Sequence, residues 1–108
     1  MFDDRLPTHL LVQAGIAQCS VNGIPAVVER KGDTQSGTIL VKLDKLDGTA
    51  ELMIQQRDID GVLGWVAARE PAIMPLAEAD SYTDRAAARD PDLWVVAIED
   101  PQARNPFA

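Results

Sequence analysis

The chain has 108 residues, of which 46% are hydrophobic and 25% are charged, and its net charge is −7. This size and balance are typical of one globular domain and exclude an intrinsically disordered chain. Because the ten basic residues are scattered and the net charge repels phosphate, we expect no nucleic-acid partner.

The first predicted element is a helix over residues 8–21. Thr8 follows Pro7 and is placed to cap the helix start, and Asn22-Gly23 tolerates the left-handed conformation that ends a helix. Two apolar rows run along it, one of Leu10, Ala14, Ala17 and Val21 and the other of Val12, Ile16 and Cys19. A helix with this much apolar surface is predicted to be deeply buried or to lie against another subunit.

A short strand over residues 26–30 and a loop over residues 31–36 lead into the main hairpin, residues 37–57. A two-residue turn at Asp47-Gly48 predicts the register of this hairpin. It sets Leu43 opposite Leu52 and Val41 opposite Ile54, so that four apolar side chains share one face. Sliding by one residue would pair Leu43 with Glu51 and break that face, so the pattern favours the first register.

A second turn, Asp60-Gly61, predicts a third meander strand over residues 62–68. If this turn also has two residues, Trp65 and Ala67 join the face that carries Leu52 and Ile54. We therefore expect one covered face and one solvated face, as in many antiparallel sheets.

Residues 71–75 are predicted to be a connector. A second helix is predicted within residues 76–89, beginning either at Pro75 or only after Asp80, where Ser81 to Asp84 resembles a capping box. Pro91 ends this helix.

Residues 93–99 form the strongest predicted strand, and both of its faces are apolar. This pattern indicates a central strand or an edge closed by a partner chain. Residues 1–5 and 101–108 are expected to be flexible. The fold class that we predict is a single α+β domain in two layers, with an antiparallel sheet, the meander plus the C-terminal strand, covered on one face by two helices.

Little in the sequence suggests catalysis or metal binding. Asp58 to Gly61 resembles the start of a calcium loop, but Arg69 stands where the bidentate carboxylate is needed, so we predict a turn. His9 is predicted to be solvated, and as the single histidine it cannot form a multi-histidine metal site. Cys19 is interpreted as a core residue. We predict no catalytic residue, no metal ligand and no cofactor.

The chain has a single cysteine, Cys19, and so cannot form an internal disulfide. This indicates a reducing compartment. The first nine residues lack a signal-peptide pattern, and no apolar run approaches the length, about 18 residues, of a membrane span. We expect a cytoplasmic protein without a membrane partner.

Two groups of charged residues are the candidates for a ligand site. Asp90 and Asp92 flank the last strand and are interpreted either as backbone caps, the favoured reading, or as paired carboxylates for acid–base work. Arg30 and Asp33 are predicted to hold a small anion or to form a surface ion pair. Candidate interface residues are Trp94, Leu93 and Val95 of the last strand.

Three segments carry a resemblance to a known family. Asp90 to Asp100, DPDLWVVAIED, is similar to the closing run of the bacterial domain-of-unknown-function family 1491. Ile24 to Leu43 looks like that family's glycine-rich strand–loop–strand, and Leu10-Leu11-Val12 stands in place of a family Leu-Trp-Val. The resemblance covers about two thirds of the chain and implies a small cytoplasmic protein without an assigned activity. It transfers no catalytic residue.

The chain also departs from the family pattern. Leu11 replaces a tryptophan, Ala17-Gln18 lies where the family tends to carry arginine, and Ala97 lies where glutamate is usual.

Two hypotheses for function follow. The first is a non-enzymatic interaction module, either a homodimer or an accessory protein that binds a protein partner. It depends on the apolar first helix, the two-sided last strand and the scarcity of catalytic side chains. The second is a small-ligand or hydrolase-like site formed by Arg30, Asp33, Asp90 and Asp92, which requires these four groups to converge on one pocket.

Overall fold

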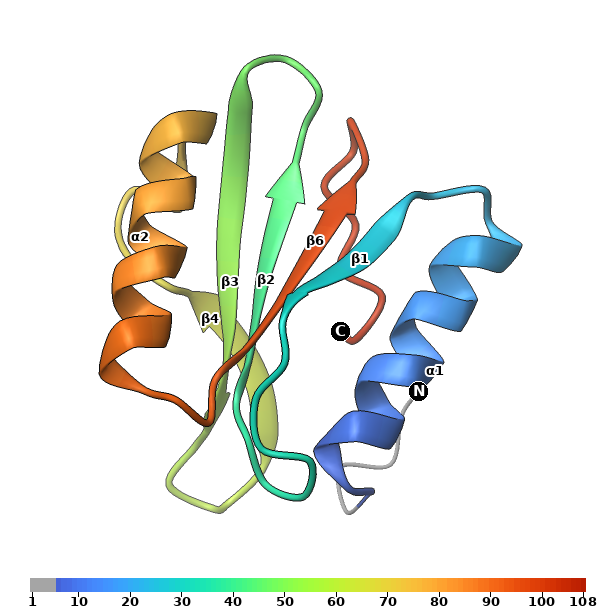
Figure 1. Cartoon of the computed structure of the whole chain (residues 1–108), viewed down its shortest axis with the longest axis vertical. Coiled ribbons are helices and arrows are strands. Elements are labelled where there is room, and N and C mark those ends of the chain that lie inside the picture. Colours follow the sequence, from blue (N-terminus) through green and yellow to red (C-terminus); the bar gives the residue numbers. More distant parts are fainter. Residues whose placement is uncertain (1–5) are drawn as a thin grey trace.

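The computed structural model describes residues 6–108, which form two helices and six strands (Figure 1). The helices are α1 (Thr8–Val21) and α2 (Leu76–Arg89). The strands are β1 (Ala26–Arg30), β2 (Ile39–Asp44), β3 (Thr49–Arg57), β4 (Leu63–Ala67), β5 (Ile73–Pro75) and β6 (Trp94–Glu99). All elements predicted from the sequence are present, and β5 is additional.

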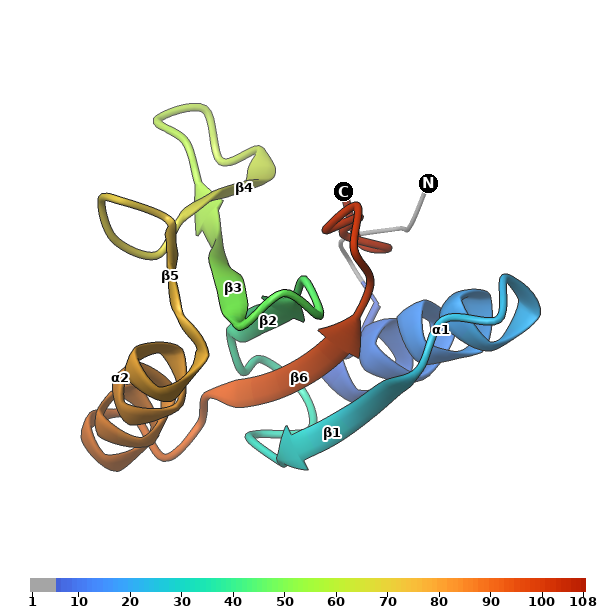
Figure 2. The same ribbon diagram turned by 90° about the horizontal axis from the view of Figure 1, so that it is seen from above.

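The strands form one sheet in the order β1-β6-β2-β3-β4, with β5 paired to β3 beside β4. β6 lies between β1 and β2, antiparallel to the first and parallel to the second, so the central position predicted for it is confirmed. The other pairs are antiparallel, and the α+β class is confirmed. Figure 2 shows how far the sheet twists between β1 and β4.

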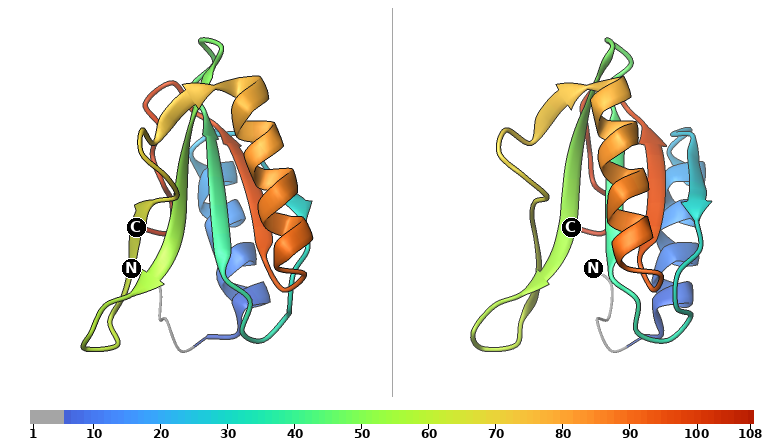
Figure 3. Two further views of the ribbon diagram at one scale, coloured as in Figure 1. Left: turned by 90° about the vertical axis from the view of Figure 1, so that its left-hand side faces the viewer. Right: turned by 60° about the vertical axis from the view of Figure 1, so that its left-hand side comes forward.

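The two helices pack against opposite faces of the central strands. Every side chain of β2 from Ile39 to Leu43 is buried. Val41 belongs to a cluster with α1, whereas Leu40 belongs to a second cluster with α2. Figure 3 shows α2 in front of the strands and α1 behind them. The two helices therefore cover opposite faces of the sheet, whereas the sequence predicted both on one face. The physical reason is that the central strands are apolar on both sides and need cover on each.

The β2–β3 hairpin has the register that the sequence disfavoured. Leu43 lies opposite Glu51, and Val41 lies opposite Met53. The N–H of Lys45 donates to the carbonyl of Thr49 at 3.0 Å, which leaves a three-residue loop in place of the predicted two. The alternation argument failed because both faces of β2 are covered, so burial favours neither register.

The turn after β3 is also one residue longer than predicted. The N–H of Asp58 donates to the carbonyl of Val62 at 3.0 Å, so three residues form this loop too. As a result Trp65 lies opposite Gln55 and shares the face of Met53, not the face of Ile54. The predicted turn is present, and the predicted face of Trp65 is wrong.

The loop before β2 accepts the hydrogen bonds of the first backbone N–H groups of α1. The backbone N–H groups of Thr8 and His9 donate to the carbonyls of Gln35 and Thr34 at 3.2 and 3.0 Å. The Thr8 hydroxyl donates to the carbonyl of Gly37 at 2.9 Å, so Thr8 ties the helix to the loop and does not cap it. The predicted end of α1 is confirmed, with Gly23 at a φ of 69°.

The predicted connector before α2 contains a short strand. β5 pairs with the first residues of β3, with Met74 opposite Ala50. The helix α2 follows directly after Pro75, the earlier of the two predicted starts. Its Thr83 hydroxyl donates to the carbonyl of Asp80 at 3.0 Å, a contact inside the helix and not a cap at its start.

The C-terminal segment, expected to be flexible, folds back between α1 and β4 (Figure 2). Ala103 and Phe107 pack against the cluster on the α1 side of the sheet. The segment is tied at its start by Asp100, whose buried carboxylate accepts from the Arg104 side chain at 2.7 Å. Residues 1–5, the other predicted flexible terminus, lie outside the described residues.

Candidate functional site

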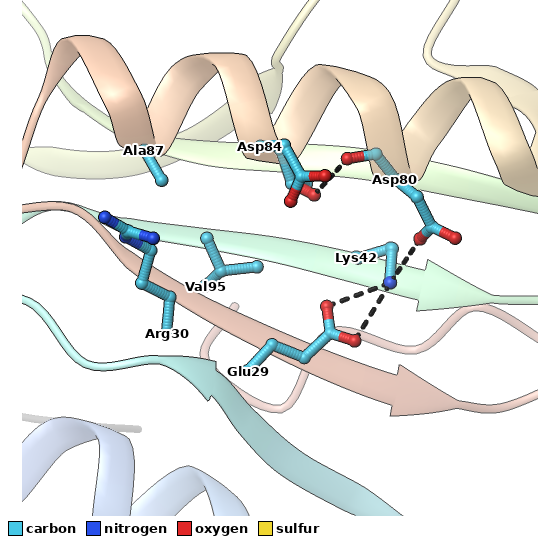
Figure 4. A pocket seen from close by; sticks show the side chains of 8 residues that line it. Glu29, Arg30, Lys42, Asp80, Asp84, Ala87 and Val95 are labelled. Carbon is cyan, nitrogen blue, oxygen red and sulfur yellow. Dashed lines mark hydrogen bonds and ion pairs between the residues drawn. The ribbon is translucent and has the colours of Figure 1, made fainter.

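A groove of about 400 Å³ separates α2 from β1 and is the candidate site (Figure 4). One wall belongs to α2 and the other to β1, and the floor is formed by β2 and β6. The lining residues, which we call the Lys42 groove, are Glu29, Arg30, Lys42, Asp80, Thr83, Asp84, Ala87 and Val95.

The spacing along each element places these side chains together. Residues 80, 83, 84 and 87 recur at three- and four-residue intervals, which puts them on one side of a helix. Lys42 alternates with Val41 along β2, so it lies on the face that α2 covers. Val95 of β6 is buried on that same face.

A β-bulge explains why two consecutive residues of β1 line one groove. Val28 pairs with Val96 of β6, and Arg30 pairs with Val95, so Glu29 is the extra residue. In a regular strand Glu29 and Arg30 would point to opposite faces. A bulge re-aims side chains in this way, and here it directs both to the α2 side.

At the floor of the groove a buried lysine is paired with two partly exposed carboxylates. The side chain of Lys42 is only 9% exposed. Its Nζ lies 2.6 Å from a carboxylate oxygen of Asp80 and 2.9 and 3.1 Å from the two oxygens of Glu29. Burial by itself disfavours the charged amine, but the hydrogen bonds that Lys42 donates to Asp80 and Glu29 outweigh it and raise the pKa of Lys42. Lys42 is therefore held as a cation by two carboxylates.

Two further charges in the groove have no partner within residues 6–108. Arg30 and Asp84 are exposed, and neither forms an ion pair or a side-chain hydrogen bond in the described part of the chain. Figure 4 shows the Arg30 guanidinium at the end near Ala87, and Asp84 reaching down from α2. Val95 lies between Arg30 and the Lys42 cluster. The Arg30 and Asp84 side chains are free to receive a ligand.

The four ligand-site residues predicted from the sequence divide between two places. Arg30 lines the Lys42 groove, whereas Asp33, Asp90 and Asp92 are not among its lining residues. The Asp33 carboxylate accepts from the backbone of Ser36 at 2.8 Å and of Gln35 at 3.1 Å, and these bonds lower its pKa. Asp33 is thus occupied by its own loop.

The corner before β6 shows the same kind of contact. The Asp90 carboxylate accepts from the backbone N–H of Asp92 at 3.1 Å, an arrangement that stabilises the local turn. The two predicted loops do meet, because the N–H of Asp33 donates to the carbonyl of Asp92 at 3.0 Å. The Trp94 indole N–H donates to the carbonyl of Asp33 at 2.7 Å. This junction is made by the backbone of Asp33 and Asp92 and by the Trp94 indole, so it ties the loops together and does not involve the carboxylates.

The residues that the sequence offered as an interface are buried in the core of the protein. Leu93, Trp94 and Val95 are each at most 4% exposed. Trp94 packs in the cluster with α1, and Leu93 and Val95 pack in the cluster with α2. The chain's own helices thus occupy the surface that a partner would have needed.

The sequence did not point to Glu29, Lys42, Asp80 and Asp84, which are four of the eight residues that line the groove. One signal was available, since Lys42 is the only charged residue inside the apolar run from Ile39 to Leu43. A lysine in a buried strand needs a carboxylate partner, which could have been sought on the helix packed above it.

The remaining candidates from the sequence have local roles. The Nδ1 of His9 lies 2.9 Å from the carbonyl oxygen of Thr34, so it is not simply solvated. Cys19 is buried in the core, and burial raises the pKa of its thiol. Among residues 6–108 no three His, Cys, Asp or Glu side chains are grouped to hold a metal ion. None of the described helices has the length and apolar character needed to cross a membrane.

Comparison with solved structures supports the fold over almost the whole chain. A crystal structure of a DUF1491 family protein from Caulobacter crescentus is 38% identical and has a TM-score of 0.84, covering 95% of this chain and 94% of that one. An NMR structure from the same organism is 37% identical, covers 96% and 94%, and has a TM-score of 0.82. The solution structure of protein Atu0922 from A. tumefaciens is 27% identical, covers 88% and 86%, and has a TM-score of 0.70.

No curated protein matches this chain. Residues 6–108 match the family described as "Protein of unknown function (DUF1491)", which confirms the resemblance found in the sequence. With that match over nearly its full length, the chain belongs to the DUF1491 family.

Proposed function

We propose that this protein is a non-enzymatic binding module that holds a small charged ligand in the Lys42 groove. The observation that carries the proposal is the buried, ion-paired Lys42 at the floor of an open cavity that also presents two unpaired charges. The groove's volume of about 400 Å³ suits a small molecule, since ligand pockets span roughly 300–1,000 Å³.

Stability alone is a poor explanation of the Lys42 cluster. Burying ions costs solvation energy, and replacing such a cluster with apolar side chains is often neutral or stabilising. Lys42 lies in a stretch of β2 that is otherwise buried and apolar, so the sheet itself does not require a charge at this position. A charged floor is better explained by the binding of a charged or strongly polar molecule.

The proposal is for binding and not for catalysis because of the side chains that line the groove. They include no histidine, cysteine or serine. The hydroxyl of Thr83 donates to the carbonyl of Asp80, so it is committed to the helix backbone. The remaining polar groups are carboxylates and cations, which orient charged ligands.

The proposal is tested by NMR titration of the ¹⁵N-labelled chain with small charged molecules. We expect the amide signals of residues 29–30, 42, 80–87 and 95 to shift on binding. Asp84→Asn should weaken the response, whereas Asp60→Asn, at the tip of the remote β3–β4 hairpin, should not. Shifts confined to other surfaces, or none with any charged probe, would reject the groove as a site.

Self-association is a second candidate function, and one observation favours it. The apolar row of Leu10, Ala14, Ala17 and Val21 points away from the core, on the side of α1 opposite the buried Val12 and Cys19. Its spacing of four, three and four residues is that of paired helices. α1 contains no Asp, Glu, Lys or Arg, so two copies of this acidic chain could pair there without like-charge contact.

Light scattering at micromolar concentration tests this second candidate. A dimer that Ala17→Glu converts to a monomer would support it, with Gln18→Glu, beside the row, as the matched control. A strict monomer for the unmodified chain would remove its support.

A further inference from the structure

We propose that the ligand of the Lys42 groove is a zwitterion, a small molecule with an anionic group that binds Arg30 and a cationic group that binds Asp84. This inference rests on the function proposed above and names its ligand class. An amino acid, with a carboxylate and an ammonium on a short carbon chain, is the simplest compound of this kind.

The groove has opposite charges at its two ends. Lys42, Glu29 and Asp80 form one cluster, which carries one net negative charge. Asp84 lies one helical turn after Asp80 and adds a second negative charge beside that cluster. Arg30 is at the other end, near Ala87 (Figure 4). A ligand lying along the groove therefore meets a negative end and a positive end.

Lys42 does not compete with Arg30 for an anion. Its Nζ already donates to Asp80 at 2.6 Å and to Glu29 at 3.1 Å, and the second Glu29 oxygen lies 2.9 Å away, so its charge is already balanced by two carboxylates. Arg30 has no such partner in the described residues, and its planar guanidinium suits the two oxygens of a carboxylate. The anionic group of the ligand is thus assigned to Arg30.

The cationic group is assigned to Asp84 by the same reasoning. The carboxylates of Asp80 and Glu29 are engaged by Lys42, whereas Asp84 is unpaired in the described residues. Val95, between Arg30 and the Lys42 cluster, and Ala87, beside Arg30, offer apolar contact to the short carbon chain that joins the two groups (Figure 4). Because the eight lining residues carry a net charge of −1, three carboxylates against two cations, a lone anion is the less suitable ligand.

The test uses the full-length chain and compares zwitterions with their halves. NMR titrations are carried out with glycine, β-alanine and 4-aminobutyrate, which separate the charges by increasing lengths, and with acetate and methylammonium. We expect at least one zwitterion to bind about tenfold or more tightly than either half, with shifts in the groove. The best chain length would report the distance that the ligand spans.

Two variants, each of which removes the charge of one exposed residue, test the binding groups assigned to the ligand. Arg30→Gln and Asp84→Asn should each weaken zwitterion binding by about tenfold. Arg89→Gln, at the end of α2, and Asp60→Asn are the matched controls and should leave it unchanged. Circular dichroism of all four variants verifies that the fold is retained.

The possible failures are distinguishable. If acetate or methylammonium shifts the groove signals with the affinity of the zwitterions, the zwitterion is overturned and the binding groove stands. Zwitterion binding that is insensitive to both Arg30→Gln and Asp84→Asn also overturns the inference. If no charged probe shifts the groove signals, the proposed function fails together with it.

Discussion

The ring of Phe107, the residue before the last, stacks on the ring of Trp65 in β4, with centroids 5.7 Å apart and planes inclined by 25°. The same ring lies over Gly15 of α1, where a methyl group would overlap it. Phe107 thus joins the C-terminal segment to the first helix and to the edge strand β4 at once. Gly15 is needed for that approach, although it lies inside a helix, where glycine is unfavourable by about 1 kcal/mol relative to alanine.

Gly15→Ala should therefore destabilise the native chain, against the usual effect of this substitution in a helix. In a Phe107→Ala background the overlap is gone, and the same change should stabilise the protein by up to about 1 kcal/mol. The free energy of unfolding in urea, measured for the four combinations, gives the comparison. An equal effect of Gly15→Ala in both backgrounds would contradict the contact.

Lys42→Met should lower the free energy of unfolding by about 1–2 kcal/mol at neutral pH, because it removes charged hydrogen bonds but keeps the apolar stem. The carboxylate side chains of Glu29 and Asp80 are 40% and 52% exposed, so water can solvate them in the variant.

The pH dependence of this effect has a defined sign. Because the folded state raises the pKa of Lys42 above its ordinary 10.5, the stabilisation is complete below that pH and is lost as the pH rises through the folded value. Urea unfolding between pH 9 and pH 12, in alkaline buffers, should show this loss above about pH 10.5 in the native chain and not in Lys42→Met. Lys31→Met, at an exposed position, is the control and should behave like the native chain.

Asp100→Asn should release the C-terminal segment. The buried carboxylate accepts from the Arg104 side chain and from the backbone N–H groups of Gln102 and Arg104, and these contacts, the side chain of Arg104 first, lower its pKa. The expected loss is about 1–3 kcal/mol of unfolding free energy at neutral pH, accompanied by a change in tryptophan fluorescence as Phe107 leaves Trp65.

Since the pKa of Asp100 is lowered in the folded state, its contribution is present above the ordinary value of 3.8 and is lost as the pH falls through the folded value. The difference between the native chain and Asp100→Asn should shrink below that pH. Asp92→Asn, at an exposed position, serves as the control. A difference that stays constant down to pH 2 would argue against an ionised Asp100 in the fold.

Gly32→Ala should destabilise the protein by about 2 kcal/mol or more, because a methyl group there would overlap the backbone carbonyl of Asp92. The 31–36 loop would then have to move away from the corner before β6. Gly64→Ala is the matched control, since its methyl group would meet nothing closer than the Gln56 carbonyl oxygen at 3.9 Å. We expect it to change stability by no more than about 0.5 kcal/mol in thermal or urea unfolding.

The residues of the Lys42 groove were not predicted from the sequence, apart from Arg30. The sequence predicts that Arg30 and Asp33 hold an anion or form an ion pair, and it offers Asp90 and Asp92 as paired carboxylates. In the structure Asp33 and Asp90 both accept hydrogen bonds from their own turns. Arg30 reaches the groove because of a bulge that leaves Glu29 unpaired with β6, and no local pattern announces that bulge. Asp80 lies 38 residues from Lys42, so their ion pair depends on how α2 packs over the sheet.

The sequence by itself determined where most elements begin and end. Pro7, Asn22-Gly23, Pro75 and Pro91 bracket the two helices, and local backbone preferences act there whatever the rest of the chain does. Only the tertiary structure decided which face each strand side chain occupies. Because β2 is buried on both sides, apolar alternation could not choose between registers one residue apart, and a three-residue loop closed by the Lys45–Thr49 hydrogen bond made the choice. The packing of one helix on each face of the sheet then sets Lys42 beneath α2 and so creates the groove.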